Sequence, residues 1–251
     1  MLKIRIIPLI QLLGSSVVKT IKFSNPRVVG DAISTVKIFN KRMADEMIIV
    51  DIGASKNKKI NYNYLKRLSK ECIMPLALGG GIHSESDVIK MFENGADKIV
   101  INSMFFDDVN LLKKIILKFG SQSVVFSLDL RKENNKYKIF SNSINSKSSK
   151  LSVKEVLKEV SDIGIGEILF NSVDRDGTML GYDYKLLKLI SNEVKVPIIA
   201  AGGCGKSEDC VLAIKSGANA VSAGSIFYWV GESILSVKKI MYKKDLNVRL
   251  L

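Results

Sequence analysis

The segment PLALGGGIHSESDVIKMFENGADKIVINSMFF (Pro75–Phe106) aligns without a gap on PIIAAGGCGKSEDCVLAIKSGANAVSAGSIFY (Pro197–Tyr228). The offset between them is 122 residues, close to half of the 251-residue chain. Because glycines, turn and serine match in register, the alignment indicates an internal duplication. The identical pairs are Pro75/Pro197, Gly80/Gly202, Gly81/Gly203, Asp87/Asp209, Gly95/Gly217, Ala96/Ala218, Ser103/Ser225 and Phe105/Phe227.

Short β-branched runs alternate with amphipathic stretches along the whole chain. This alternation predicts a parallel sheet, and eight such units in about 250 residues fit a closed (β/α)₈ TIM barrel. We expect an α/β fold with one domain over 1–251, built from half-barrels at about 1–120 and 121–251. A doubly wound sheet is the alternative, but no GxGxxG follows the first run. Strands are expected at 4–10, 47–52, 75–78, 98–102, 123–129, 167–171, 197–201 and 220–224, and helices at 61–71, 86–93, 153–161 and 207–215.

The composition excludes several classes of protein. Hydrophobic residues make up 47% of the chain and the mean hydropathy is +0.16, which excludes a disordered chain. No apolar run reaches the roughly 20 residues of a membrane-spanning helix, so we expect no membrane partner. Cys72, Cys204 and Cys210 fit no disulfide framework or metal spacing. We therefore expect a cytoplasmic protein with neither a metal nor a cofactor.

The net charge is +13, from 38 Lys and Arg against 25 Asp and Glu. Because the lysines are spread along the chain, the pattern is typical of a solvated surface, and an anionic partner is the alternative. No basic tail or recognition-helix pattern supports nucleic acid. Phosphorylated small molecules are therefore the expected ligands.

The stretch 131–150 (RKENNKYKIFSNSINSKSSK) interrupts the alternation. It is polar and rich in Ser, Asn and Lys, with a strand-like YKIF core. It follows the fifth expected strand, so it should lie at the C-terminal face of the barrel. Long loops there usually shape or cover an active site.

Each copy of the repeat carries a glycine-rich turn after one strand and a small polar residue after the next. Glycine lets backbone N–H groups approach an anion, and a helix N-terminus adds favourable polarity. Since ligands bind at the C-terminal ends of barrel strands, the duplication predicts two phosphate sites and a substrate with a phosphate at each end. The simpler interpretation is that glycine only permits tight turns. The residues are Gly80, Gly81, Asn102 and Ser103 in the first copy and Gly202, Gly203, Gly224 and Ser225 in the second, to which Asp176 and Gly177 add N–H groups.

Acidic residues follow three of the expected strands. Asp129 ends an apolar strand, where a carboxylate is costly unless it is paired or functional, so we predict a general acid or base there. Asp51 and Asp174 fit a structural role in a loop as well as catalysis. Lys19 is within reach of an anion at the mouth. His83, the single histidine, is interpreted as a surface-loop residue and not as a base.

Charged residues also mark the opposite end of the expected barrel. Arg5, Glu46, Lys98 and Glu167 lie at or near the starts of strands 1, 2, 4 and 6. Inward-facing charges at the bottom of a barrel should pair with one another. They form either a structural plug or a gate to an axial passage.

A set of motifs occurs in the order found in a known family. On these motifs the chain resembles the cyclase subunit of imidazole glycerol phosphate synthase (HisF) over nearly its full length. A related isomerase of histidine biosynthesis shares the half-barrel repeat, but DRDGT, GYD and NVRL fit HisF better. The motifs are RII (5–7), VVK (17–19), GGGIH (79–83), GADK (95–98), FGSQSVV (119–125), GEIL (166–169), DRDGT (174–178), GYD (181–183) and NVRL (247–250).

The resemblance implies a substrate with two phosphates and ammonia supplied by a glutaminase docked at the barrel bottom. Ammonia passes a charged gate, whose four positions match Arg5, Glu46, Lys98 and Glu167, and then the barrel axis. It closes an imidazole ring and releases an aminoimidazole carboxamide nucleotide. The family uses two aspartates as acid and base. One corresponds to Asp129, and Gln11 occupies the position of the other.

Gln11 is the informative departure from the family, because an amide cannot exchange a proton as a carboxylate does. Together with VKTIKF (18–23), it resembles a HisF paralogue found with surface-polysaccharide genes. There a HisH-like glutaminase and the barrel are thought to supply ammonia to a separate sugar amidotransferase. We therefore expect an ammonia-channelling subunit. The alternatives are a working cyclase that tolerates Gln11 and a noncatalytic activator of the glutaminase.

Overall fold

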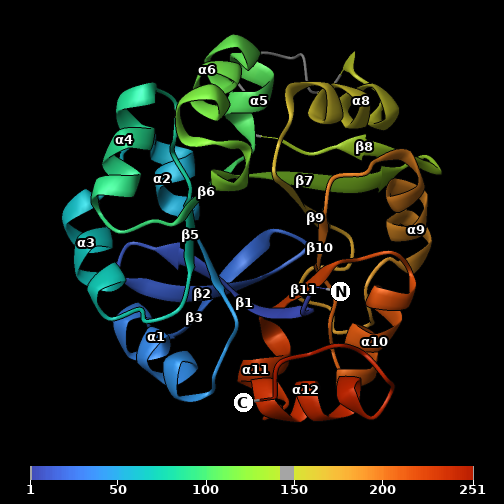
Figure 1. Ribbon diagram of the computed structural model, residues 1–251. Coiled ribbons are helices and arrows are strands. Elements are labelled where there is room, and N and C mark those ends of the chain that lie inside the picture. Colours follow the sequence, from blue (N-terminus) through green and yellow to red (C-terminus); the bar gives the residue numbers. More distant parts are fainter. Residues whose placement is uncertain (1, 142–149, 251) are drawn as a thin grey trace.

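The computed structural model describes residues 2–141 and 150–250. Within these residues, eight parallel strands form a barrel that closes where β11 pairs with β1, and helices surround it (Figure 1). This confirms the predicted α/β fold and the (β/α)₈ TIM barrel. The barrel strands are β1 (Arg5–Leu13), β4 (Met47–Asp51), β5 (Leu76–Gly79), β6 (Lys98–Ile101), β7 (Val124–Glu133), β9 (Glu167–Ser172), β10 (Ile198–Ala201) and β11 (Ala220–Ala223).

The outer helices begin at polar capping residues and turn an apolar face to the strands. In α4, Ser84 and Asp87 form a capping box, while Val88 and Met91, three residues apart, are buried. No helix in the described ranges is long and apolar enough to cross a bilayer. The helices are α1 (Ala32–Lys41), α2 (Ile52–Asn57), α3 (Tyr62–Lys70), α4 (Glu85–Glu93), α5 (Ser103–Asp107), α6 (Val109–Phe119), α8 (Val153–Ile163), α9 (Tyr184–Glu193), α10 (Ser207–Lys215), α11 (Ser225–Trp229) and α12 (Ile234–Tyr242).

Two hairpins extend the barrel at its C-terminal end. The strand β1 continues beyond the predicted 4–10 and folds back through β2 (Ser16–Ile21) and β3 (Ser24–Asp31). Within the polar stretch 131–150, β7 turns back into β8 (Lys136–Ile139) through Asn134 and Asn135, both with positive φ. Neither hairpin was predicted as such. Positions 142–149 of that stretch lie outside the described residues.

The sequence repeat is also a repeat of contacts. The Tyr62 hydroxyl donates to Asp87 Oδ1 at 2.7 Å, and the Tyr184 hydroxyl donates to Asp209 Oδ1 at 2.9 Å, each pair displaced by the same offset. This recurrence supports the duplication, whereas the half-barrel boundaries near residue 120 stay a prediction. The same offset relates two side chains that accept from the N–H group at the start of a strand, Asp97 from Leu76 and Asn219 from Ile198.

The barrel interior is a separate apolar core. Because side chains alternate along a strand, Glu167, Leu169 and Asn171 of β9 lie at three successive levels of the interior. The middle level belongs to a cluster distinct from the larger core between strands and helices. We call it the axial cluster: Ile7, Leu9, Ile48, Ala77, Val100, Val125, Leu169, Ile199, Ala201 and Ala220, with Val50 packed against it.

Candidate active site at the barrel mouth

A cavity of about 280 Å³ opens at the C-terminal ends of the strands. We call it the mouth cavity. Leu9, Val100 and Leu169 of the axial cluster line it, so it continues the barrel axis. The structure brings the predicted residues of the first phosphate site together with both catalytic positions on its wall: Gly80, Gly81, Asn102, Ser103, Gln11 and Asp129.

A second, smaller cavity of about 20 Å³ adjoins the first, and Leu9 and Gln11 line both. We call it the side cavity. The two predicted phosphate sites therefore lie at one mouth with Gln11 between them, while phosphate binding itself stays a prediction. The side cavity gathers the second set of predicted residues: Lys19, Asp176, Gly177, Gly202, Gly203, Gly224 and Ser225.

Backbone geometry at both sites suits an anion. Gly80 has φ +104°, and a Cβ there would lie 2.2 Å from the Asp51 carbonyl oxygen, so only glycine fits this turn. The short helices α5 and α11 begin at Ser103 and Ser225, and no described side chain caps either one. Their first N–H groups are therefore free to meet a ligand.

Lys19 supplies a buried positive charge to the side cavity. It lies on β2, and its Nζ donates to the Leu9 carbonyl oxygen at 2.7 Å. Burial lowers the pKa of Lys19 to about 8, which the Asp176 carboxylate partly offsets. A Cβ on Gly224 would lie 2.0 Å from this nitrogen, so the glycine leaves room for the ammonium group. Lys19 is thus mostly protonated at neutral pH.

Asp129 has the properties of a general acid or base. Ser127 Oγ donates to its Oδ1 at 3.0 Å, and Asn102 Nδ2 donates to its Oδ2 at 3.1 Å. Burial, together with the nearby charge of Asp176, raises the pKa of Asp129 to about 7, against the hydrogen bond from Ser127. Asp129 can therefore gain or lose a proton near neutral pH.

Gln11 is buried on β1, at the position where the sequence resemblance implies an aspartate. The Thr20 hydroxyl lies 3.3 Å from its Oε1 and 2.8 Å from Asp176 Oδ2. Asp176 lies in the loop after β9. The Thr20 hydroxyl therefore bridges Gln11 to a carboxylate that is distant in the sequence. Burial raises the pKa of Asp176, against the Thr20 hydrogen bond and the Lys19 charge. The sequence around Gln11 gave no indication that Asp176 lies near it.

Asp51 and Asp174 each make a structural contact. Asp51 Oδ1 accepts from Ala54 N at 2.8 Å and caps α2, and its side chain lies outside the lining of both cavities. Asp174 Oδ2 accepts from Lys132 N at 2.7 Å and fixes the β7–β8 hairpin. A substrate contact of Asp51 stays a prediction.

Two unpaired polar atoms in the mouth cavity were missed by the sequence analysis. His83 Nε2 and Asn171 Oδ1 are buried and have no hydrogen-bond partner among the described residues, and both side chains line the cavity. His83 lies in a loop, as expected, but it is half-buried and its ring lines the cavity. Unpaired buried polar atoms are costly in a folded protein, so they indicate a polar ligand here.

A closed ring of ion pairs lies at the opposite end of the axis. Arg5 contacts Glu46 and Glu167, and Lys98 Nζ lies 2.9 Å from Glu46 Oε1 and 2.8 Å from Glu167 Oε2. Burial alone would lower the pKa of Arg5, but the two carboxylates raise it. Burial alone would raise the pKa of Glu167, but Arg5 and Lys98 lower it. We call these four residues the charged ring, and the structure confirms that they pair.

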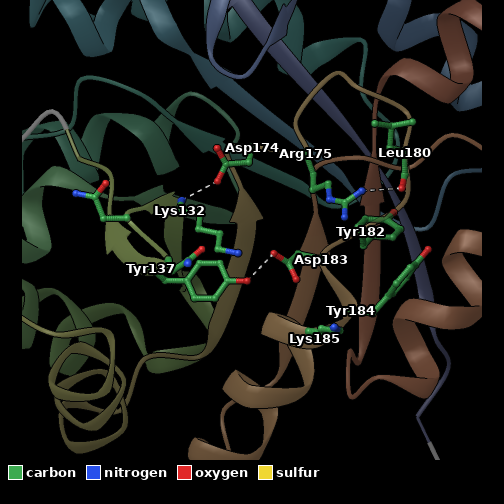
Figure 2. Close-up of a pocket in the computed structure, with 11 residues that line it drawn as sticks. Lys132, Tyr137, Asp174, Arg175, Leu180, Tyr182, Asp183, Tyr184 and Lys185 are labelled. Carbon is green, nitrogen blue, oxygen red and sulfur yellow. Dashed lines mark hydrogen bonds between the residues drawn. The ribbon is translucent and has the colours of Figure 1, made fainter.

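A larger groove of about 790 Å³ lies between the β7–β8 hairpin and the start of α9 (Figure 2). Figure 2 shows Tyr137 and Asp183 pointing toward each other, and the Tyr137 hydroxyl donates to Asp183 Oδ2 at 3.2 Å. Arg175 Nη1 donates to the Leu180 carbonyl oxygen at 3.0 Å. The first hydrogen bond holds the hairpin to the start of α9, and the second holds the loop that carries Asp176 in place.

The fold and site define a (β/α)₈-barrel enzyme class with a titratable carboxyl group between two glycine-rich turns at the mouth. Residues 5–231 match the family described as "Histidine biosynthesis protein". A provisionally named imidazole glycerol phosphate synthase subunit hisF2 of Campylobacter jejuni is 39% identical over 251 residues and covers 100% of both chains.

A provisionally named hisF2 subunit of Pseudomonas aeruginosa is 40% identical over 235 residues, 92% of this chain and 93% of its own. The imidazole glycerol phosphate synthase subunit HisF of Dictyoglomus thermophilum is 38% identical over 255 residues and covers 100% of both chains. The chain therefore belongs to the histidine biosynthesis protein family and, within it, to the HisF subunits of imidazole glycerol phosphate synthase. This confirms the resemblance found in the sequence.

Proposed function

We propose that this protein is an ammonia-conducting HisF-type subunit. It takes ammonia from a HisH-like glutaminase bound at the charged ring and delivers it to the mouth. From there a separate amidotransferase uses it to amidinate a surface-polysaccharide sugar. The hisF2 relatives support the paralogue assignment by name, and the axis of the barrel supports the route.

Three levels along the axis carry the argument for conduction. The charged ring has two cations and two carboxylates, so it has no net charge and blocks the N-terminal end. The axial cluster above it is entirely aliphatic. A neutral ammonia molecule can cross such an interior, whereas an ammonium ion would lose its hydration without compensation. Passage requires the ring to open at one of its ion pairs.

The presence of Gln11 favours delivery of ammonia to a separate enzyme over its consumption at this mouth. The charged ring and the axial cluster are complete, but the mouth has an amide where the family has a catalytic aspartate. An amide hydrogen-bonds to a ligand without exchanging a proton with it. Ammonia that reaches this mouth therefore meets the carboxyl group of Asp129 on β7 and the amide of Gln11 on β1, instead of two carboxyl groups on these strands.

A second candidate function is the complete cyclase reaction, and Asp176 favours it. This carboxylate lies beside Thr20, which also contacts Gln11, so it offers a second titratable group on the β1 side of the mouth. Asp129 and both glycine-rich turns are in place as well. In this case the protein converts the bisphosphorylated ribulosyl substrate and ammonia into imidazole glycerol phosphate and the aminoimidazole carboxamide nucleotide.

A cyclase assay with the bisphosphorylated ribulosyl substrate and excess ammonium distinguishes the two functions. Excess ammonium removes the need for a glutaminase. We expect no turnover by the wild type and a gain of turnover in Gln11→Asp, with Asp129→Asn in the same background as the inactive control. Clear turnover by the wild type would establish the cyclase and overturn the delivery proposal.

A further inference from the structure

Asn171 occupies the point where the barrel axis meets the mouth cavity. It lies two positions beyond Leu169 of the axial cluster and four beyond Glu167 of the charged ring, on the same inward-facing side of β9. Its side chain is 4% exposed, and its buried Oδ1 has no hydrogen-bond partner among the described residues. A molecule that leaves the axial cluster therefore meets an unpaired acceptor.

We propose that Asn171 Oδ1 is the ammonia-binding group at the exit of the barrel axis. This inference rests on the proposed function, since it needs ammonia to arrive along the axis. Ammonia carries three N–H donors and has left an interior that offers no acceptor. Asn171 Oδ1, which has no partner among the described residues, is open to an N–H···O hydrogen bond from this ammonia.

The chemistry of an amide suits this position better than that of a carboxyl group. A carboxylic acid can transfer its proton to ammonia, which converts a nucleophile into ammonium, whereas an amide has no such proton. With an N–H group bound to Oδ1, the nitrogen lone pair stays free. Gln11, at the other side of the cavity, is also an amide, so two neutral groups face the exit.

The neighbours of Asn171 keep its oxygen available. In the parallel pairing of β7 and β9, Asn171 lies opposite Asp129, whose carboxylate form has no donor for Asn171 Oδ1 and takes the donors of Ser127 and Asn102 for itself. A Cβ on Gly202 would lie 2.4 Å from Asn171 Oδ1. Glycine at 202 therefore gives the amide its space, and the same glycine belongs to the second phosphate turn.

Binding is tested on the isolated protein by NMR of ¹⁵N-labelled side-chain amides. The Asn171 signal is assigned by its loss in Asn171→Leu. Ammonium chloride is titrated at alkaline pH, where much of it is ammonia, and at acid pH, with potassium chloride at each pH as the ionic control. We expect a saturable shift of the Asn171 signal at alkaline pH only. No shift beyond the potassium control would overturn the inference, whatever the glutaminase does.

Function is tested on the complex with its HisH-like glutaminase and the acceptor reaction. Asn171→Leu should lower glutamine-dependent transfer about tenfold, the order expected for one lost hydrogen bond to a bound substrate, and should change transfer from saturating external ammonium far less. Asn171→Asp keeps an acceptor oxygen but adds a carboxyl group that can protonate ammonia, so it should also lower glutamine-dependent transfer, and it replaces the leucine variant if that variant does not fold. Asn110→Leu, at an exposed position of α6, is the matched control.

The outcomes separate this inference from the proposed function. If both Asn171 variants transfer glutamine-derived ammonia like the wild type while charged-ring variants do not, conduction stands and the role of Asn171 fails. If charged-ring variants also transfer normally, the conduction proposal itself fails. An NMR shift in that second case would support binding of ammonia that enters from the mouth, and would overturn its arrival along the axis.

Discussion

Lys98 Nζ lies 2.8 Å from Glu167 Oε2 across the N-terminal end of the barrel, although the two residues are 69 positions apart. Their strands, β6 and β9, are separated by β7, so the contact spans the interior instead of joining neighbours. Glu167 also contacts Arg5. One carboxylate therefore holds two cations in place at the foot of the axis.

Glu167→Gln should destabilise the fold, because both cations lose a charged partner in a largely buried position. We expect a loss of about 2–3 kcal/mol in the free energy of unfolding, below the full effect of a deeply buried pair because the ring is partly hydrated. Glu85→Gln breaks the exposed pair with Lys118 and should cost much less, because solvent screens that pair. Urea unfolding measures both, and equal losses would contradict the view of the ring as a cooperative unit.

The same ring should control ammonia. In the proposed complex, Glu167→Gln should raise the share of glutamine-derived ammonia that escapes to bulk solvent, because it disrupts the ring through which that ammonia enters the axis. Isotopic competition between amide-¹⁵N glutamine and unlabelled ammonium measures this share. A share identical to that of Glu85→Gln would leave the ring with a structural role alone.

Asp129 should make stability depend on pH. Its pKa in the folded state, about 7, is above the ordinary value near 4, so the folded protein binds this proton more tightly than the unfolded chain. The resulting stabilisation is present below about pH 4 and is lost as pH rises to about 7. Relative to wild type, Asp129→Asn should therefore gain about 4 kcal/mol between pH 4 and pH 8, measured by urea unfolding at each pH. A constant difference across this range would refute the raised pKa.

Lys19 should make anion binding depend on pH in the range around pH 8. Its pKa, about 8, means that the positive charge of the side cavity is lost as pH rises through that value. The affinity for inorganic phosphate, measured by calorimetry, should fall across this range. Lys19→Met should bind weakly at every pH, and the exposed Lys188→Met should behave like the wild type. A wild-type affinity unchanged across pH 8 would exclude Lys19 from the site.

The barrel followed from the sequence because its signals are local. The repeat indicated the glycine-rich turns, and the positions of Arg5 and Glu167 at the starts of expected strands indicated the charged end of the barrel. The hairpin β2–β3 was missed because β3 (SNPRVVGD) is mostly exposed and shows no alternation. Its turn at Lys22 and Phe23 uses positive φ without glycine, so no sequence marker showed it.

The mouth was only partly predictable, because its remaining contacts are long-range. Asp176 reaches Gln11 through Thr20 of the unexpected hairpin, and Lys22 N donates to the Asp176 carbonyl oxygen at 2.9 Å. No pattern in either segment indicates the other. Asn171 could have been found, since it follows Glu167 by four residues on an inward-facing strand.

The duplicated tyrosine–aspartate pairs should contribute equally to stability. Tyr62→Phe and Tyr184→Phe each remove one hydrogen bond to a carboxylate, at 2.7 and 2.9 Å, and should each cost about 1–2 kcal/mol. Tyr242→Phe, at an exposed site on α12, should be close to neutral. Thermal and urea unfolding provide the values. A loss of stability in only one of the two variants would show that the tyrosine–aspartate hydrogen bond no longer has the same role in both copies.

Gly80→Ala should lower the stability of the fold far more than Gly14→Ala. Gly14 and Gly80 have φ +65° and +104°, so alanine is strained at both. At Gly14 a Cβ meets nothing within 4 Å, and the backbone penalty alone should cost about 1 kcal/mol. At Gly80 the Cβ would lie 2.2 Å from the Asp51 carbonyl oxygen, so the turn must move away from β4. We expect a loss above about 3 kcal/mol together with weaker phosphate binding, measured by urea unfolding and calorimetry, because the moved turn withdraws its N–H groups from the mouth cavity. A stable Gly80→Ala that binds phosphate normally would show that the turn has other conformations open to it, and the close packing of its backbone on Asp51 would then not be what shapes the first site.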